Sequence, residues 1–294
     1  MPAEPLLSSQ ILAKLEAYDL ASRKTFLGRF KGERRSTRKG RSVEFADFRN
    51  YSQGDDLRFV DWNGFARLDR LFLKLFFEEE DLHFYGLLDA SPSMDFGEPT
   101  KFDAGRRLLA ALGFIGLIRA HRVKVETLGQ GRRPSPAWRG RGQVRALFDR
   151  LRAWAPQETT PLADGVRDFV LRNPSRGVVV LVSDLLDKRG FDEALRTLAA
   201  RRSDVYVVHV LSREELRPDV AGDLRLVDCE DRTAAEITVA EPLLRAYDRT
   251  LRSFLNEARE FCVARGMQYV FLENDAPLER AVLEVLRRQG APCR

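Results

Sequence analysis

The chain has 294 residues, of which 44% are hydrophobic and 32% are charged, enough for one large domain or two modest ones. The formal net charge is +5, and the longest apolar run, residues 108–118, is too short for a membrane span. The N-terminus lacks the basic and apolar regions of a secretory signal. Three widely spaced cysteines (Cys229, Cys262, Cys293) predict neither a disulfide framework nor a zinc site. We therefore expect a cytoplasmic globular protein with reduced thiols.

The basic charge is concentrated near the N-terminus. Nine Lys and Arg residues and one acid, Glu33, lie between Arg23 and Arg41. Such a stretch is compatible with phosphate contacts, with an acidic protein partner, or with a solvated segment. Aromatic residues are not interleaved with these charges, as they are in single-strand stacking platforms. A nucleic-acid partner is therefore disfavoured.

The first 80 residues predict an N-terminal helix followed by a β-rich segment. Residues 5–28 carry apolar side chains at helical spacing. Residues 43–80 mix aromatic and β-branched residues with Gly-Asp and Asn-Gly turn signals, which predicts short strands with irregular loops. We place a domain boundary after this part, so that residues 1–80 and 81–294 form separate domains.

From residue 81 onward, short apolar runs alternate with amphipathic stretches. The runs predict strands over residues 82–88, 123–128, 178–182, 205–210 and 268–272. The stretches predict helices over residues 102–119, 144–154, 162–171, 191–200, 243–264 and 278–288. This alternation predicts an α/β fold with a doubly wound, mostly parallel sheet flanked by helices. His83 and His209 fall inside strands, where they are expected to be core residues.

Oxygen-bearing side chains follow two of the predicted strands. Asp89, Ser91 and Ser93 come directly after the first, and Asp184 ends the strand over residues 178–182. Extended geometry sends alternate side chains the same way, and ligands collect at the carboxyl ends of parallel strands. Thr160, at the start of a helix, adds a hydroxyl from another loop. Each residue taken singly is also compatible with a helix cap, Thr160 before Pro161 most of all.

Two carboxylates and three hydroxyls form a ligand set suited to a hard cation. Six-coordinate Mg²⁺ is the expected ion, and Mn²⁺ or Ca²⁺ could substitute. Because three of the ligands are neutral, the ion would keep positive charge and an open position for an acidic side chain of a protein partner. A hydrolytic site would need more acid and a general base, and no histidine lies in these loops. We therefore expect binding and no enzyme activity.

Two alternatives remain at this point. One is a metal-dependent hydrolase or phosphotransferase with Asp89 as nucleophile, although Ser91 stands where an Asp-x-Asp pattern would supply the second acid. The other is nucleic-acid binding through residues 23–41.

The three loops resemble the metal-ion-dependent adhesion site of von Willebrand factor A domains. The similarity rests on the stretches Asp89-Ala90-Ser91-Pro92-Ser93-Met94, Thr160-Pro161-Leu162-Ala163 and Val182-Ser183-Asp184. It implies Asp89, Ser91, Ser93, Thr160 and Asp184 as metal ligands. The second loop has Glu158-Thr159-Thr160 where many relatives have Gly-Gly-Thr, so that either threonine could serve. The third has Leu185 where glycine is common.

The segment over residues 45–80 resembles the signature of bacterial domain-of-unknown-function family 58, and the similarity runs from about Gly40 to the C-terminus. The resemblance implies that this chain is the short soluble form of that family. It also implies that the chain works with a MoxR-type AAA+ ATPase in chaperone-like assembly or maturation of other proteins. The chain has no Gly-x-x-x-x-Gly-Lys-Ser/Thr loop, so ATP hydrolysis would belong to the partner.

Charged and aromatic residues alternate densely within this signature. They are Arg49, Tyr51, Asp55, Asp56, Arg58, Asp61, Trp62 and Arg67. We expect Arg–carboxylate pairs that lock the loops, with Trp62 and Tyr51 packed on guanidinium faces. An acidic catalytic cluster is the alternative; an arginine within a few residues of every Asp favours pairing.

Overall fold

The computed structural model describes residues 6–17, 45–76, 83–129, 135–156, 160–201 and 203–288. The chain forms two compact units, Met1–Ser22 with Leu82–Arg294 and Arg23–Asp81. This differs from the expected boundary after residue 80, because the N-terminal helix belongs to the larger unit.

The N-terminal helix spans residues 9–17, so the helix expected over residues 5–28 begins later than predicted, because residues 6–8 are not helical. Residues 5 and 18–28 lie outside the described residues. Three apolar side chains in and directly before this helix are buried: Leu6, Leu7 and Leu15. Lys14 Nζ forms an ion pair with Glu279 Oε1 at 3.0 Å, near the other end of the sequence. Burial of these leucines is the physical reason why the helix joins the larger unit.

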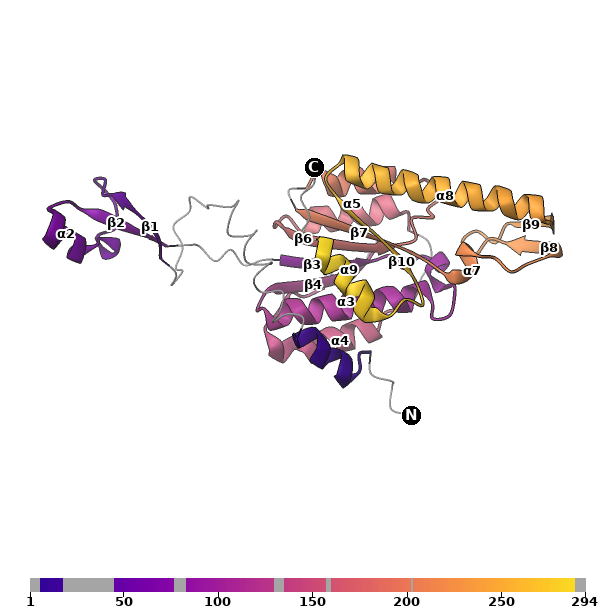
Figure 1. Cartoon of the computed structure of the whole chain (residues 1–294), viewed down its shortest axis with the longest axis horizontal. Helices are drawn as coiled ribbons and strands as arrows, with labels where there is room; N and C mark the ends of the chain where they lie inside the picture. The colour runs from indigo at the N-terminus through magenta and orange to yellow at the C-terminus, as the bar shows by residue number, and fades with distance from the viewer. Residues whose placement is uncertain are drawn as a thin grey trace. The chain divides into compact units, whose positions relative to one another are not determined.

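The larger unit is built on a six-stranded sheet with the order β10-β7-β6-β3-β4-β5 (Figure 1). All neighbours in it are parallel except β4 and β5. The strands are β3 (His83–Leu88), β4 (Arg122–Thr127), β5 (Trp138–Arg139), β6 (Gly177–Ser183), β7 (Asp204–Leu211) and β10 (Gln268–Glu273).

Helices cover both faces of this sheet (Figure 1). One face carries α3 (Lys101–Ile118), with α4 (Val144–Arg152) and α9 (Leu278–Arg288) beside it. The other carries α5 (Leu162–Arg172), α6 (Asp192–Ala199) and α8 (Glu241–Ala264). The doubly wound α/β fold expected from the sequence is confirmed.

Alternation along β3 shows how the two faces differ. Tyr85 and Leu87 lie in the buried cluster formed with α5, α6 and α8. Gly86 faces α3, where a Cβ atom would come within 3.0 Å of the Leu109 side chain. α3 therefore packs closely on the sheet, which fixes the position of its first turn.

Residues 213–239 hold elements that the sequence did not indicate. α7 (Arg213–Leu216) is a single turn, and β8 (Gly222–Val227) pairs with β9 (Ala234–Val239) in a separate antiparallel hairpin. Most residues of the hairpin are exposed. An exposed hairpin has no buried face to impose an apolar pattern, so periodicity carried no signal for it.

The smaller unit pairs β1 (Phe45–Asn50) with β2 (Phe72–Phe76) in antiparallel fashion. Between them lie a 3₁₀ turn, η1 (Leu57–Phe59), and the helix α2 (Trp62–Leu68). The expected short strands are present, whereas α2 was not expected: it has seven residues, including Gly64, and leaves Trp62 exposed. Among the helices within the described ranges, none has the length and hydropathy of a membrane span.

Candidate metal centre

The first and third loops of the expected site meet at the carboxyl end of the sheet. β3 and β6 are parallel neighbours in which Leu88 pairs with Val182, so Asp89 follows β3 beside Ser183, and Asp184 comes one residue later. The backbone N–H of Asp89 donates to the Val182 carbonyl at 2.9 Å. The Ser183 hydroxyl donates to Asp89 Oδ2 at 2.6 Å. A hydrogen bond thus joins the two loops directly.

The first loop brings its oxygen atoms together. The Ser91 N–H donates to Asp89 Oδ1 at 3.0 Å, and the Ser91 and Ser93 hydroxyl oxygens lie 2.9 Å apart. The short helix η2 (Pro92–Asp95) follows, and its first residue is a proline. Asp89, Ser91 and Ser93 are all only partly buried. The convergence predicted for these three side chains is therefore present.

The second loop is tied to the third through Asp187. The Leu162 N–H, at the start of α5, donates to Asp187 Oδ2 at 2.5 Å. Pro161 caps α5 without a side-chain hydrogen bond, so the alternative that Thr160 serves as the N-cap is wrong. Thr160 lies partly buried directly before that cap, and Thr159 lies outside the described residues.

The third loop contains backbone strain directly after Asp184. Leu185 has a φ of +57°, which favours glycine, and its side chain is buried. This explains why glycine suits the position in the adhesion-site pattern. The Leu185 N–H donates to the Ser183 hydroxyl at 3.0 Å, which holds the turn. Ser183 therefore organises two loops, a role that the sequence did not reveal.

Lys101 is the residue that sequence reasoning missed most completely. It is the first residue of α3, and its side chain is 0% exposed. Its Nζ lies 2.7 Å from Asp184 Oδ2 and 2.5 Å from Glu215 Oε1. A lysine at the N-terminus of a helix faces the positive end of the helix dipole, and this unusual placement was the available signal.

Negative charge exceeds positive charge around these loops. Burial, and then the neighbouring Asp184 carboxylate, raise the pKa of Asp89. Asp184 itself is buried, 1% exposed, and Lys101 is the cation in contact with it. A bound cation would relieve this repulsion.

The donor set fits a hard divalent ion. It consists of oxygen atoms only, with the first-loop groups open to solvent. Across the described ranges, no three His, Cys, Asp or Glu side chains gather as a metal-binding group. The set therefore depends on the serine hydroxyls beside the two aspartates, and Thr160 remains a predicted ligand.

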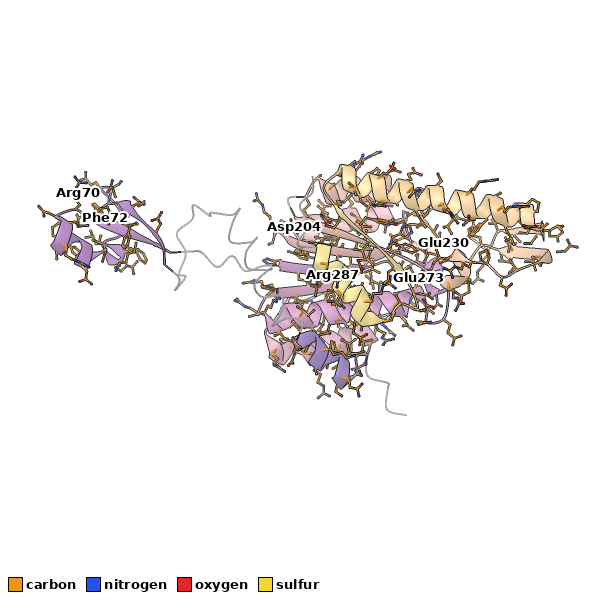
Figure 2. All side chains as sticks on the ribbon, viewed as in Figure 1. Arg70, Phe72, Asp204, Glu230, Glu273 and Arg287 are labelled. Carbon is orange, nitrogen blue, oxygen red and sulfur yellow. The ribbon has the colours of Figure 1, made fainter. Side chains whose placement is uncertain are left out.

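An acidic turn between β8 and β9 lies at the same end of the sheet. Glu230, in this turn, and Glu273, at the end of β10, lie at one end of the sheet, and Asp204, at the start of β7, lies at the opposite end (Figure 2). Lys188 holds the turn by ion pairs to Asp228, at 2.9 Å, and to Asp231. Burial raises the pKa of Glu230, followed by repulsion from Asp184 and its acidic neighbours.

The signature residues of the smaller unit pair partly as expected. Arg49 binds Asp55 and Arg58 binds Asp56, each at 2.6 Å. Asp61, however, pairs with Lys74 at 3.1 Å, which lowers the pKa of Asp61 mainly by hydrogen bonding. These pairs close local turns, in agreement with the locking role.

The expected aromatic stacking is wrong. Trp62 packs edge-on against Phe65 with ring centroids 6.4 Å apart, and within the described part of the chain no guanidinium lies over it or over Tyr51. Arg67 Nε donates to the Asn63 carbonyl at 3.2 Å, one turn earlier in α2. The basic stretch over residues 23–41 lies outside the described residues.

Comparison with known proteins gives the family. The model of the family described as "Protein of unknown function DUF58" matches residues 47–254. The chain belongs to the DUF58 family. This DUF58 protein is 28% identical over 244 residues to Uncharacterized protein Rv1480 of Mycobacterium tuberculosis, covering 80% of this chain and 76% of that one. It shows the same identity and coverage with Uncharacterized protein Mb1516 of Mycobacterium bovis.

Two solved structures are among those to which the DUF58 protein is similar. The protein BatB from Bacteroides thetaiotaomicron gives a TM-score of 0.42 at 13% identity, covering 71% of this chain and 100% of that one. The SpRpn10 VWA domain gives 0.39 at 13% identity, covering 73% and 97%.

Proposed function

We propose that this DUF58 protein is a non-enzymatic protein-binding module that docks an acidic side chain of its partner through a divalent cation. Mg²⁺ is the proposed ion, and Asp89, Ser91, Ser93, Thr160 and Asp184 are its proposed ligands. The observation that carries this proposal is the convergence of the first and third loops, joined by the hydrogen bond from Ser183 to Asp89 at 2.6 Å.

The ligand chemistry favours docking over catalysis. Both Asp89 carboxylate oxygens already accept hydrogen bonds, one from the Ser91 N–H and one from the Ser183 hydroxyl. A bound ion would supply positive charge, and the neutral serine hydroxyls would leave much of that charge for an outside carboxylate. The partner's acid would complete the coordination shell, with no bond made or broken.

For the partner, we propose a MoxR-type AAA+ ATPase, with this chain as its adaptor in the assembly or maturation of other proteins. The support is the family resemblance together with the absence of a nucleotide-binding loop in the sequence. The chain would then bind the partner proteins, and the ATPase would hydrolyse ATP.

Metal binding by Asp89→Ala and Ser91→Ala/Ser93→Ala variants tests this function. Calorimetry with Mg²⁺ should give one site in the native protein and an affinity reduced at least about tenfold in both variants, since each loses oxygen ligands. Binding to a purified MoxR-type ATPase of the same organism should weaken in parallel, and a chelator should weaken native binding equally.

Asp149→Ala is the matched control, because Asp149 is an exposed aspartate on α4 that pairs with Arg152 at 3.0 Å, remote from the three loops. It should bind both Mg²⁺ and the ATPase like the native protein. Equal ATPase binding by all variants, with and without chelator, would show that docking does not pass through the metal.

A further inference from the structure

We propose that Lys101 is a built-in counter-cation of the candidate metal centre. Its ammonium group holds Asp184 while no metal is bound and opposes a divalent cation that enters. This inference rests on the proposed metal site, and it adds a residue that limits metal affinity. Without metal, Lys101 keeps the third loop in position; with metal, its charge makes binding weaker than the oxygen ligands alone would give.

The first step of the argument is the burial of the charge. Lys101 and Asp184 are 0% and 1% exposed, and their charged atoms lie 2.7 Å apart. A buried ammonium group at the N-terminus of α3 is unfavourable unless carboxylates compensate it. Asp184 and Glu215 provide that compensation on two sides. The site thus contains its own cation.

The second step is the occupancy of Asp184. Its Oδ2 atom accepts from Lys101, and its Oδ1 atom accepts from the Leu186 N–H at 3.1 Å. Both oxygens of this proposed ligand therefore already have protein partners. A metal ion that contacts Asp184, directly or through water, must share it with a positive charge about one hydrogen-bond length away.

The third step is the anchor on the other side of Lys101. Glu215 Oε1 binds Lys101, whereas its Oε2 accepts from the Ser212 N–H at 2.7 Å in the capping box of α7. The Tyr247 hydroxyl, on α8, donates to the Glu215 carbonyl at 2.8 Å. Contacts in α7 and with α8 therefore hold Glu215 in place. Because Glu215 binds the Lys101 ammonium group, that group stays where it is even if Asp184 moves toward a metal ion. Lys101 acts as a fixed positive charge.

Calorimetry with Mg²⁺ on Lys101→Met, Glu215→Gln and native full-length protein tests the inference. Lys101→Met should bind Mg²⁺ about tenfold more tightly or better, because a unit positive charge a few ångströms from the ion is removed. Its unfolding temperature should also rise more on addition of Mg²⁺ than that of the native protein. Glu215→Gln leaves the ammonium to Asp184 alone and should weaken Mg²⁺ binding severalfold.

Lys124→Met is the matched control. Lys124 is a mostly buried lysine on β4 that pairs with the Glu126 carboxylate at 3.0 Å and with the Asn173 amide oxygen at 2.6 Å. It should bind Mg²⁺ like the native protein.

A folded Lys101→Met protein that binds Mg²⁺ no more tightly than the native protein would overturn the role of Lys101 and leave the proposed metal site intact. If neither the native protein nor Lys101→Met binds Mg²⁺ in a way that depends on Asp89, both the proposed metal site and this inference are wrong. If Lys101→Met fails to fold with or without Mg²⁺, Glu215→Gln decides, and native affinity in that variant overturns the inference.

Discussion

Buried charge is the main theme at the scale of single residues. Lys101, Asp184 and His209 lie close together beneath the third loop, and each affects the electrostatic environment of the others. His209 is fully buried in β7 and its Nδ1 atom lies 2.9 Å from the Tyr269 hydroxyl. Its ring packs edge-on against Phe254, 5.5 Å away. A core histidine was expected here, and this environment confirms it.

His209 predicts a pH dependence of stability. Burial lowers the pKa of His209 from 6.5 to about 4; Asp184 opposes this shift and Lys101 adds to it. The unfolded chain therefore takes up a proton near pH 6.5 that the folded chain refuses until about pH 4, so stability falls as the pH decreases through this window. We expect His209 to account for about 2 to 3 kcal/mol of that loss.

Urea unfolding of native protein and His209→Gln at pH 7 and near pH 4.5 measures this contribution. Glutamine retains a polar partner for Tyr269 but has no proton to bind. The variant should lose less stability than the native protein between the two pH values. An equal loss in both proteins would contradict the prediction.

At the scale of elements, α3 links the packing of the sheet to the candidate metal centre. A Cβ atom on Gly105 would come within 2.6 Å of Leu88, the last residue of β3, and within 2.9 Å of Val182, the last apolar residue of β6. The close approach of α3 at this point places Lys101, one helical turn earlier, beside Asp184. A small residue in the helix therefore contributes to the geometry of the charged groups.

Gly105→Ala should destabilise the protein by about 1 to 3 kcal/mol, because the added methyl group overpacks a core contact. Helix propensity alone predicts the opposite sign, since alanine is favoured over glycine in a helix by about 1 kcal/mol. Chemical denaturation separates the two effects. Gly142→Ala is the control: it has open space around its Cβ position and should leave stability nearly unchanged.

At the scale of the whole molecule, the two units differ in how much apolar surface each buries. β6 is buried along its entire length. In the smaller unit, by contrast, Val60 and Leu73 are the buried apolar side chains among those described. Trp62 and Leu68 are 57% and 63% exposed there. Since apolar burial provides most of the stabilising free energy, the units should differ in stability.

Amide hydrogen exchange measured by mass spectrometry should show this difference. Peptides covering β6 and β7 should exchange most slowly, and peptides from residues 45–76 should exchange orders of magnitude faster under the same conditions. Equal protection in the two units would contradict the prediction and would indicate that they unfold together.

Much of the fold could be predicted because its signals are local. The strands β3, β6 and β7 appear as continuous apolar runs, since burial on both faces of a sheet excludes polar residues. Helices such as α8 repeat apolar positions at helical spacing because only one face is covered. The exposed β8–β9 hairpin and α2 lack such a constraint, so their sequences did not indicate them.

The sequence by itself also determined the ligand types of the candidate metal centre and the order of its loops, because side chains that follow neighbouring parallel strands must meet at one edge. Only the tertiary structure decided which charges share that edge. Lys101 and Glu215 are 83 and 31 residues from Asp184, and no local pattern relates residues so far apart. The contacts among Lys101, Glu215 and Asp184 follow from the packing of α3 on the sheet and of α7 beside α3. This packing places a lysine beside the loops whose oxygen atoms would otherwise favour a metal ion.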